Sequence, residues 1–238
     1  MSKLIFFDTE TTGNTEKDVL IQLAYKTAGE EFNGLYKPAI KIPPEASAVH
    51  HITNKMVTDK PSFKESAEWA KIKKLFEEKE SVPVAHNAPF DLMMLKKEDI
   101  VPVRFICTLR VARHLDKEGK IDRYNLQYLR YLLDLDVEAT AHDALGDVLV
   151  LEKLFDRLKN KIVQEENIPE DEAINQMVEI SSHPSMLRTF NFGKYLGKKI
   201  EDVLTIDRGY LEWLLAQKLQ SDQLDEDWIY TLKYHLGK

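Results

Sequence analysis

The chain has 238 residues, 43% hydrophobic and 31% charged, and 40 acidic residues against 33 Lys and Arg give a formal charge of −7. This length predicts one or two domains, and the hydrophobic content suffices for a folded core, which excludes a disordered chain. Apolar runs such as residues 4–7 are too short for a membrane span or a signal peptide, so we expect a soluble, cytoplasmic protein without a membrane partner. The single cysteine, Cys107, excludes an intramolecular disulfide. The acidic balance argues against nucleic-acid binding over the whole surface.

The first two thirds of the chain alternate between strand and helix patterns. A continuously apolar, aromatic-rich run at residues 3–8 predicts a strand buried on both faces. Pro89 suits the first turn of a helix. The same patterns predict further strands at 19–27, 31–36, 82–85 and 103–106, and helical segments at 46–78, 89–95, 125–133 and 143–158. Strands first and strand–helix alternation later predict an α/β fold with a sheet of mixed direction.

The composition changes after Lys159. Six acidic residues between 165 and 179 indicate a polar connector that carries one exposed helix. Beyond it, Leu224, Trp228, Leu232 and Leu236 repeat every four residues, which predicts a helix with a core-facing stripe. A unit of about 55 residues is small for independent stability, so we expect it to pack on the first domain. We therefore predict a domain at 1–160, an acidic connector at 161–184 and a small α+β module at 185–238.

Four acidic residues fall where the backbone enters or leaves the predicted core. Asp8 and Glu10 are two residues apart at the end of the first strand and therefore share a face, although an isolated pair of this kind is more often a solvated strand end. Asp91 falls in the first turn of a predicted helix, where the helix dipole alone also favours an acid. Asp147 lies against the apolar stripe of its helix, where an unpaired carboxylate is costly.

His142 precedes Asp147 by five residues and can reach the same place, although a lone histidine is more often structural. Oxygen ligands of this number suit Mg²⁺ or Mn²⁺ better than zinc. Two such ions about 3.5–4 Å apart clamp the attacking and leaving oxygens of a phosphoryl transfer. A histidine with a pKa near 6.5 suits the general base that activates water. The residues therefore predict metal-assisted phosphoryl chemistry.

Three segments that contain these residues resemble, in order, the three exonuclease motifs of the DnaQ-like DEDDh 3′→5′ exonucleases. They are Phe-Phe-Asp-Thr-Glu-Thr-Thr-Gly at 6–13, Val-Ala-His-Asn-Ala-Pro-Phe-Asp at 84–91 and His-Asp-Ala-Leu-Gly-Asp at 142–147. Segments 48–53, 60–63 and 106–108 resemble the bacterial exonuclease X branch of that family. The resemblance covers residues 2–159. It implies an RNase H-like fold, with a mixed five-stranded sheet flanked by helices, that removes nucleoside monophosphates from a free 3′ end.

The resemblance also implies a role for each matched residue. Asp8 would bridge two metal ions, Glu10 and Asp147 would complete the first metal site, and Asp91 would support the second. His142 would take the proton from the attacking water. The residues expected to contact substrate are Thr11, Thr12, Gly13, His50, Ile52, His86, Asn87 and Phe90. His51 stands where members of the family often have glycine, which leaves the shape of this pocket open.

The predicted C-terminal module contains a segment that interleaves aromatic residues with lysines. Between residues 183 and 200 there are four Arg and Lys and no acidic residue. Aromatic surfaces beside a cationic track suit single-stranded nucleic acid, with Lys194 and Lys198 as candidate contacts. The alternative is a turn with solvated lysines whose aromatic residues fill a small core. The segment resembles the C-terminal module of exonuclease X-like proteins.

The sequence thus favours a Mg²⁺- or Mn²⁺-dependent 3′→5′ exonuclease that acts on DNA, with single-stranded DNA or the 3′ ends of duplex DNA as partner. An exoribonuclease and a polymerase-associated proofreading enzyme are alternatives within the same chemistry, because contacts to a 2′-OH cannot be located in the sequence. A non-catalytic nucleic-acid-binding protein would need no charged Asp147 on a packed helix face. The oligomeric state stays open.

Overall fold

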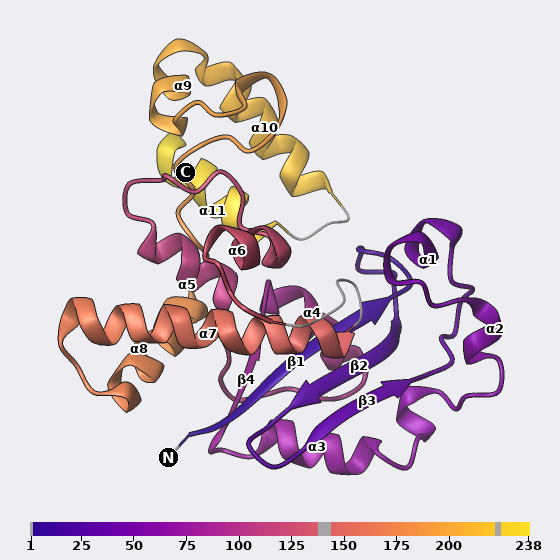
Figure 1. Ribbon diagram of the computed structural model, residues 1–238. Coiled ribbons are helices and arrows are strands. Elements are labelled where there is room, and N and C mark those ends of the chain that lie inside the picture. Colours follow the sequence, from indigo (N-terminus) through magenta and orange to yellow (C-terminus); the bar gives the residue numbers. More distant parts are fainter. Residues whose placement is uncertain (1, 138–143, 222–224) are drawn as a thin grey trace.

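The computed structural model describes residues 2–137, 144–221 and 225–238 (Figure 1). Its centre is a five-stranded sheet of order β3-β2-β1-β4-β5. β1 pairs antiparallel with β2 and parallel with β4, which confirms the predicted mixed sheet and α/β class. The strands are β1 (Lys3–Thr11), β2 (Leu20–Lys26), β3 (Glu31–Leu35), β4 (Ser81–Ala85) and β5 (Ile106–Cys107).

Helices cover both faces of the sheet, which is why β1 is apolar on both sides. On one face, Phe6 packs against α7 (Ala144–Glu166) in the first core cluster. On the other face, Ile5 and Phe7 pack against α3 (Trp69–Glu77) and α4 (Ala88–Lys97) in the second cluster. Figure 1 shows α7 lying across the sheet, with α3 on the opposite side. The sheet is therefore the middle layer of a three-layer domain.

Several predicted elements differ in extent from the observed ones. Residues 46–78 form four short pieces: α1 (Pro44–His50), α2 (Asn54–Val57), a 3₁₀ turn (Phe63–Glu65) and α3. The strand expected at 103–106 is shortened to β5, because only Ile106 and Cys107 pair with β4 at the sheet edge. Helices α5 (Thr108–Leu115) and α6 (Leu126–Leu132) follow.

The predicted exposed helix of the acidic connector was wrong in its burial. α8 (Glu170–Ser182) buries Ala173, Ile174 and Met177 in the same core cluster as α7. The hydroxyl of Ser181 accepts a hydrogen bond of 2.8 Å from the backbone N–H of Cys107. The acidic residues lie mostly outside this apolar stripe, so charge counting alone missed it. α8 is thus packed on the first domain, while the boundaries at 160 and 184 stay a prediction.

The C-terminal module has its own core. α9 (Ile200–Ile206), α10 (Arg208–Gln220) and α11 (Glu226–Leu236) surround a third apolar cluster that includes Phe190 and the predicted stripe residues Trp228, Leu232 and Leu236. Leu224 lies outside the described residues. Instead of a sheet, the described part of the module has one β-bridge, between Thr189 and Lys199. Figure 1 shows these helices gathered at the end of the molecule beside α5 and α6.

No helix within the described ranges is both long enough and apolar enough to cross a membrane.

Candidate active site

The packing of α7 on β1 brings carboxylates from distant parts of the chain together. The rings of Phe6 and Phe155 meet edge to face, with centroids 5.2 Å apart. From Phe155 back to Asp147 is two helical turns, about 12 Å. From Phe6 forward to Glu10 is four strand residues, about 13 Å. Because these two lengths match and Phe6, Asp8 and Glu10 share one face, the acidic end of β1 lies beside the start of α7.

The result is a cluster of three carboxylates. One oxygen from each of Asp8, Glu10 and Asp147 lies within 4.8 Å of the others. Asp147 is only 9% exposed. Three anions held this close repel one another unless a cation lies between them, and carboxylate oxygens are the ligands that Mg²⁺ and Mn²⁺ prefer. These residues therefore fit a divalent metal ion, as the sequence predicts.

Gln127 of α6 adds a hydrogen bond to this cluster. Its amide Nε2 donates to Oδ1 of Asp147 at 2.5 Å. A neutral donor holds the carboxylate in one orientation without neutralising its charge. Sequence reasoning missed Gln127, because it belongs to no motif and its partner lies 20 positions along the chain.

Asp91 lies beside the end of β1 and is not one of the three clustered carboxylates. Its Oδ1 accepts hydrogen bonds from the backbone N–H of Thr9 at 3.2 Å and from the Thr9 hydroxyl at 2.7 Å. Thr9 stands between Asp8 and Glu10 in the strand, so its side chain points to the opposite face. Burial raises the pKa of Asp91 to about 7, although the bonds from Thr9 act in the opposite direction. Sequence reasoning missed Thr9.

His142, the predicted general base, lies outside the described residues. Its predicted neighbour Asp147 is in the first turn of α7, three residues after Ala144, where the description of the chain resumes. The role of His142 therefore stays a prediction.

The end of β1 and the turn after it hold three residues of the predicted substrate pocket. The Thr12 hydroxyl donates to the carboxylate of Asp18 at 2.9 Å, and the Thr11 hydroxyl donates to the backbone oxygen of Gly13 at 2.5 Å. A Cβ atom at Gly13 would lie 2.7 Å from that carboxylate, too close for a side chain. The turn is therefore tight: a side chain at residue 13 would displace the Asp18 carboxylate from its hydrogen bonds with Thr12 and Thr15.

The end of α1 brings two more predicted residues to this place. Nδ1 of His50 accepts a hydrogen bond of 3.0 Å from the backbone N–H of Ile52. Burial lowers the pKa of His50, while the backbone of Thr11 acts in the opposite direction, which places the imidazole beside the end of β1. His51 ends α1 with φ of 61°, in the left-handed region. Glycine adopts this conformation at the lowest cost, so His51 occupies a backbone position that would suit glycine.

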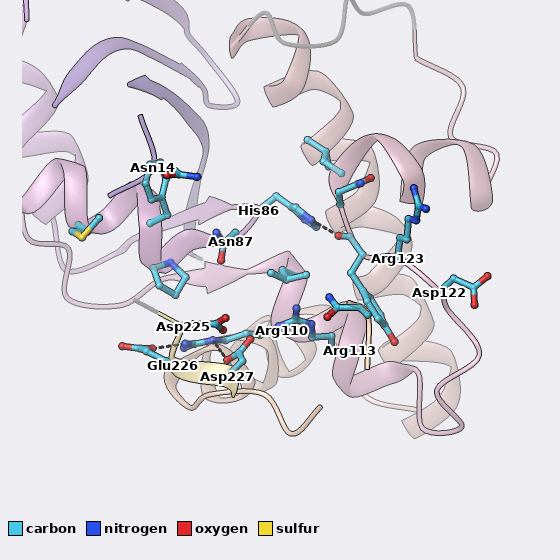
Figure 2. Close-up of a pocket in the computed structure, with 18 residues that line it drawn as sticks. Asn14, His86, Asn87, Arg110, Arg113, Asp122, Arg123, Asp225, Glu226 and Asp227 are labelled. Atoms are coloured by element: carbon cyan, nitrogen blue, oxygen red, sulfur yellow. Dashed lines mark hydrogen bonds and ion pairs between the residues drawn. The ribbon is translucent and has the colours of Figure 1, made fainter. Parts of the chain in front are cut away.

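The second motif forms the wall of a cleft. His86, Asn87 and Phe90 line a cavity of about 760 Å³ between the first domain and the C-terminal module (Figure 2). Both ring nitrogens of His86 are used within the protein, at 2.9 Å from the hydroxyl of Thr108 and 2.6 Å from the backbone oxygen of Tyr124. His86 therefore has a structural role in this wall, and Asn87 and Phe90 are the more available contacts.

The aromatic and cationic segment of the module is organised differently from the predicted track. Phe190 and Tyr195 are 1% and 8% exposed and belong to the module core, so they offer no stacking surface. Lys194 forms an ion pair of 3.0 Å with Asp207, and its hydrogen bonds to Tyr195 and Asp207 raise its pKa. Lys198 is exposed. The alternative interpretation, a turn over a small aromatic core, describes this segment.

Comparison with known proteins agrees with this site. A family model described as Exonuclease matches residues 5–155, and a model described as Exodeoxyribonuclease X-like C-terminal matches residues 190–218. The chain is 32% identical over 243 aligned positions to exodeoxyribonuclease 10 of Escherichia coli (strain K12), and the match covers 98% of each chain.

Solved structures show the same fold. A structure of exonuclease X in complex with 5′ overhanging duplex DNA matches with a TM-score of 0.57 and 27% identity, and covers 75% of this chain and 99% of that one. Escherichia coli exonuclease I with a dA16 oligonucleotide matches at a TM-score of 0.54 and 22% identity over 69% of this chain and 43% of that one, a likeness of fold alone. With its RNase H-like sheet, its carboxylate cluster and the match over residues 5–155, the chain belongs to the exonuclease family.

Proposed function

We propose that this protein is a divalent-metal-dependent exonuclease that removes nucleoside monophosphates from the 3′ end of DNA. The observation that carries the proposal is the convergence of Asp8, Glu10 and Asp147 within 4.8 Å in a chain of the exonuclease family. DNA as substrate is supported by the match to exodeoxyribonuclease 10 over 98% of the chain. The proposal retains the predicted cytoplasmic location.

The metal is Mg²⁺ or Mn²⁺ in this proposal, with two ions per active site. Asp8, Glu10 and Asp147 would hold metal at the carboxylate cluster, and Asp91 would support a second ion. When bound, such ions stabilise the charge that develops on the attacking and leaving oxygens. Gln127 keeps the Asp147 carboxylate in its orientation, and Thr9 does the same for Asp91. His142 accepts the proton of the attacking water, as its place in the third motif implies.

The terminal nucleotide is proposed to lie between the turn after β1 and the end of α1. Thr11, Thr12 and Gly13 supply backbone groups on one side, and His50 and Ile52 lie on the other. Asn87 and Phe90 extend this surface toward the cleft. The tight turn at Gly13 and the hydrogen bond between Ile52 and His50 support a preformed pocket.

Degradation of 5′-labelled single-stranded DNA, duplex DNA and single-stranded RNA, each with Mg²⁺, Mn²⁺ or EDTA, tests the proposal. We expect a ladder that shortens from the 3′ end of DNA only when metal is present. Cleavage in EDTA would contradict the metal requirement. Faster loss of RNA than of DNA would instead identify an exoribonuclease, and binding without cleavage would identify a non-catalytic nucleic-acid-binding protein.

A further inference from the structure

The cleft between the first domain and the C-terminal module adjoins two of the exonuclease motifs, although its lining does not include the clustered Asp8, Glu10 and Asp147. Asn87 and Phe90 belong to the second motif, and Asn14 follows Gly13, the last residue of the first motif. The volume of about 760 Å³ falls within the range of ligand sites, about 300–1,000 Å³. A strand whose 3′ end occupies the active site can therefore continue into this cleft.

One wall is a loop that the first domain holds in place. The carboxylate of Asp116 accepts hydrogen bonds from the backbone N–H groups of Lys120 and Ile121, both at 2.9 Å, and from the Tyr124 hydroxyl at 2.6 Å. The Tyr124 carbonyl lies 2.6 Å from Nε2 of His86, which ties the loop to the second motif. The loop presents Arg123 on the side of the cleft opposite Asn14 (Figure 2).

The start of α11, in the module, forms part of the opposite wall, and ion pairs fix it. Arg110, which is 5% exposed, pairs with Glu226 at 2.6 Å and with Asp227 at 3.5 Å. Arg113 also pairs with Asp227, which accepts a further hydrogen bond of 2.8 Å from the backbone N–H of Ser185. Figure 2 shows Arg110 and Arg113 beside these acidic residues. This docking brings Asn191 of the module to the cleft.

The charges of the cleft leave Arg123 available. Glu226 and Asp227 are paired with arginines, and Asp225 is paired with Lys218 at 2.5 Å. Among the described residues, the exposed side chains of Arg123 and Asp122 are the lining charges outside any ion pair. The lining thus offers one arginine and exposed asparagine amides, which suit one phosphate and the polar edges of bases or sugars, with the neighbouring Asp122 as the one acidic lining residue outside the ion pairs described.

We propose that this cleft binds the single-stranded part of the substrate on the 5′ side of its terminal nucleotide. Arg123 contacts a phosphate, and Asn191 supplies a contact from the C-terminal module. In this proposal the C-terminal module contacts nucleic acid through its part of the cleft wall. The predicted contacts at Lys194 and Lys198 are not used. This inference rests on the proposed function, because it assigns the path of that substrate.

The double variant Arg123→Ala/Asn191→Ala tests the assignment in the full chain. Arg157 and Asn160 are exposed on α7 and do not line the cleft, so Arg157→Ala/Asn160→Ala is the matched control for both charge and amide. Binding is measured by fluorescence anisotropy of a 5′-labelled oligothymidylate in EDTA, at several salt concentrations. Turnover is measured separately with Mn²⁺ on the p-nitrophenyl ester of thymidine 5′-monophosphate, which has no nucleotide to place in the cleft.

We expect the cleft variant to bind the oligonucleotide about tenfold more weakly, as the loss of about 1.4 kcal/mol implies. The slope of log K against log salt concentration should fall in magnitude by about 0.7, as for one phosphate contact on a single strand. The control should bind like the wild type, and all three proteins should hydrolyse the ester equally. Equal oligonucleotide affinity and salt slope in the three proteins would overturn the cleft assignment. A wild-type protein that binds but hydrolyses neither substrate would instead contradict the proposed function.

Discussion

Gln127 of α6 donates a hydrogen bond of 2.5 Å to Oδ1 of Asp147 at the start of α7. α6 itself supplies none of the proposed metal ligands. Through Gln127 it nevertheless contacts Asp147, the carboxylate that completes the proposed metal site. The orientation of Asp147 is thereby determined by the packing of α6 as well as by α7.

Removal of this donor should weaken catalysis without unfolding the protein. We expect Gln127→Ala to lower activity about tenfold or more and to raise the metal concentration required, because groups that orient metal ligands contribute roughly 10- to 100-fold. The measurement is kcat/KM on DNA across a series of Mn²⁺ concentrations. Gln164→Ala, an exposed glutamine on α7, is the control. A Gln127→Ala enzyme with unchanged activity and metal dependence would argue against the positioning role.

The hydroxyl of Thr9 should contribute to stability through Asp91. Thr9→Val keeps the size of the side chain but removes the donor at 2.7 Å, while the backbone N–H of residue 9 remains. We expect the free energy of unfolding to fall by about 1 kcal/mol and the pKa of Asp91 to rise further. Urea denaturation measures the first effect. Thr9→Ser should recover most of the loss, and equal stability of the valine variant and the wild type would contradict this role.

His86 should make the stability of the protein depend on pH. Burial lowers the pKa of His86 to about 4, whereas an unfolded histidine titrates near 6.5. The unfolded state therefore binds the proton first, so this contribution to stability is complete above pH 6.5 and is lost as the pH falls to 4. The loss should reach up to roughly 3 kcal/mol. His86→Gln should flatten the curve of unfolding free energy between these pH values, and the exposed His114→Gln should leave it unchanged. If the unfolding free energy of His86→Gln depends on pH as steeply as that of the wild type, His86 is not the source of the pH dependence.

The ion pairs of Asp227 should hold the C-terminal module on the first domain. Asp227→Ala removes the partner of Arg113 and one of the two carboxylates that pair with Arg110. Removing one partner of a buried ion pair costs about 3–5 kcal/mol. Thermal and urea unfolding should show a loss below this range, because Arg110 keeps its pair with Glu226 and Arg113 is partly exposed, or a separate early transition of the module. Asp202→Ala, at an exposed position of α9, is the control. Unchanged unfolding of Asp227→Ala would show that the ion pairs of Asp227 are not needed to dock the module.

The sequence predicted those parts of the site that follow from local periodicity. Alternation along residues 3–11 placed Asp8 and Glu10 on one face, and the apolar stripe of α7 placed Asp147 against the core. Both patterns depend on neighbours within one element, so they are readable without the fold. The mixed sheet followed in the same way from the order of strand and helix signals.

The contacts that depend on tertiary structure were beyond this kind of prediction. Gln127 lies 20 positions from Asp147, and Arg110 lies 116 positions from Glu226. No local sequence pattern predicts such a pair. Composition was also misleading where charge and burial compete: α8 is rich in acids yet packs into the core, and Phe190 lies among cations yet is buried.

Hydrolysis of 5′-labelled single-stranded DNA by the wild type and by Asp8→Ala, compared in Mg²⁺, tests the central claim most directly. If the carboxylate cluster holds the catalytic metal, the wild type shortens the DNA from its 3′ end, and Asp8→Ala loses about a thousandfold or more of the rate. Circular dichroism and thermal unfolding must show that the variant is folded. A folded Asp8→Ala protein that degrades DNA at the wild-type rate would contradict the assignment of this site.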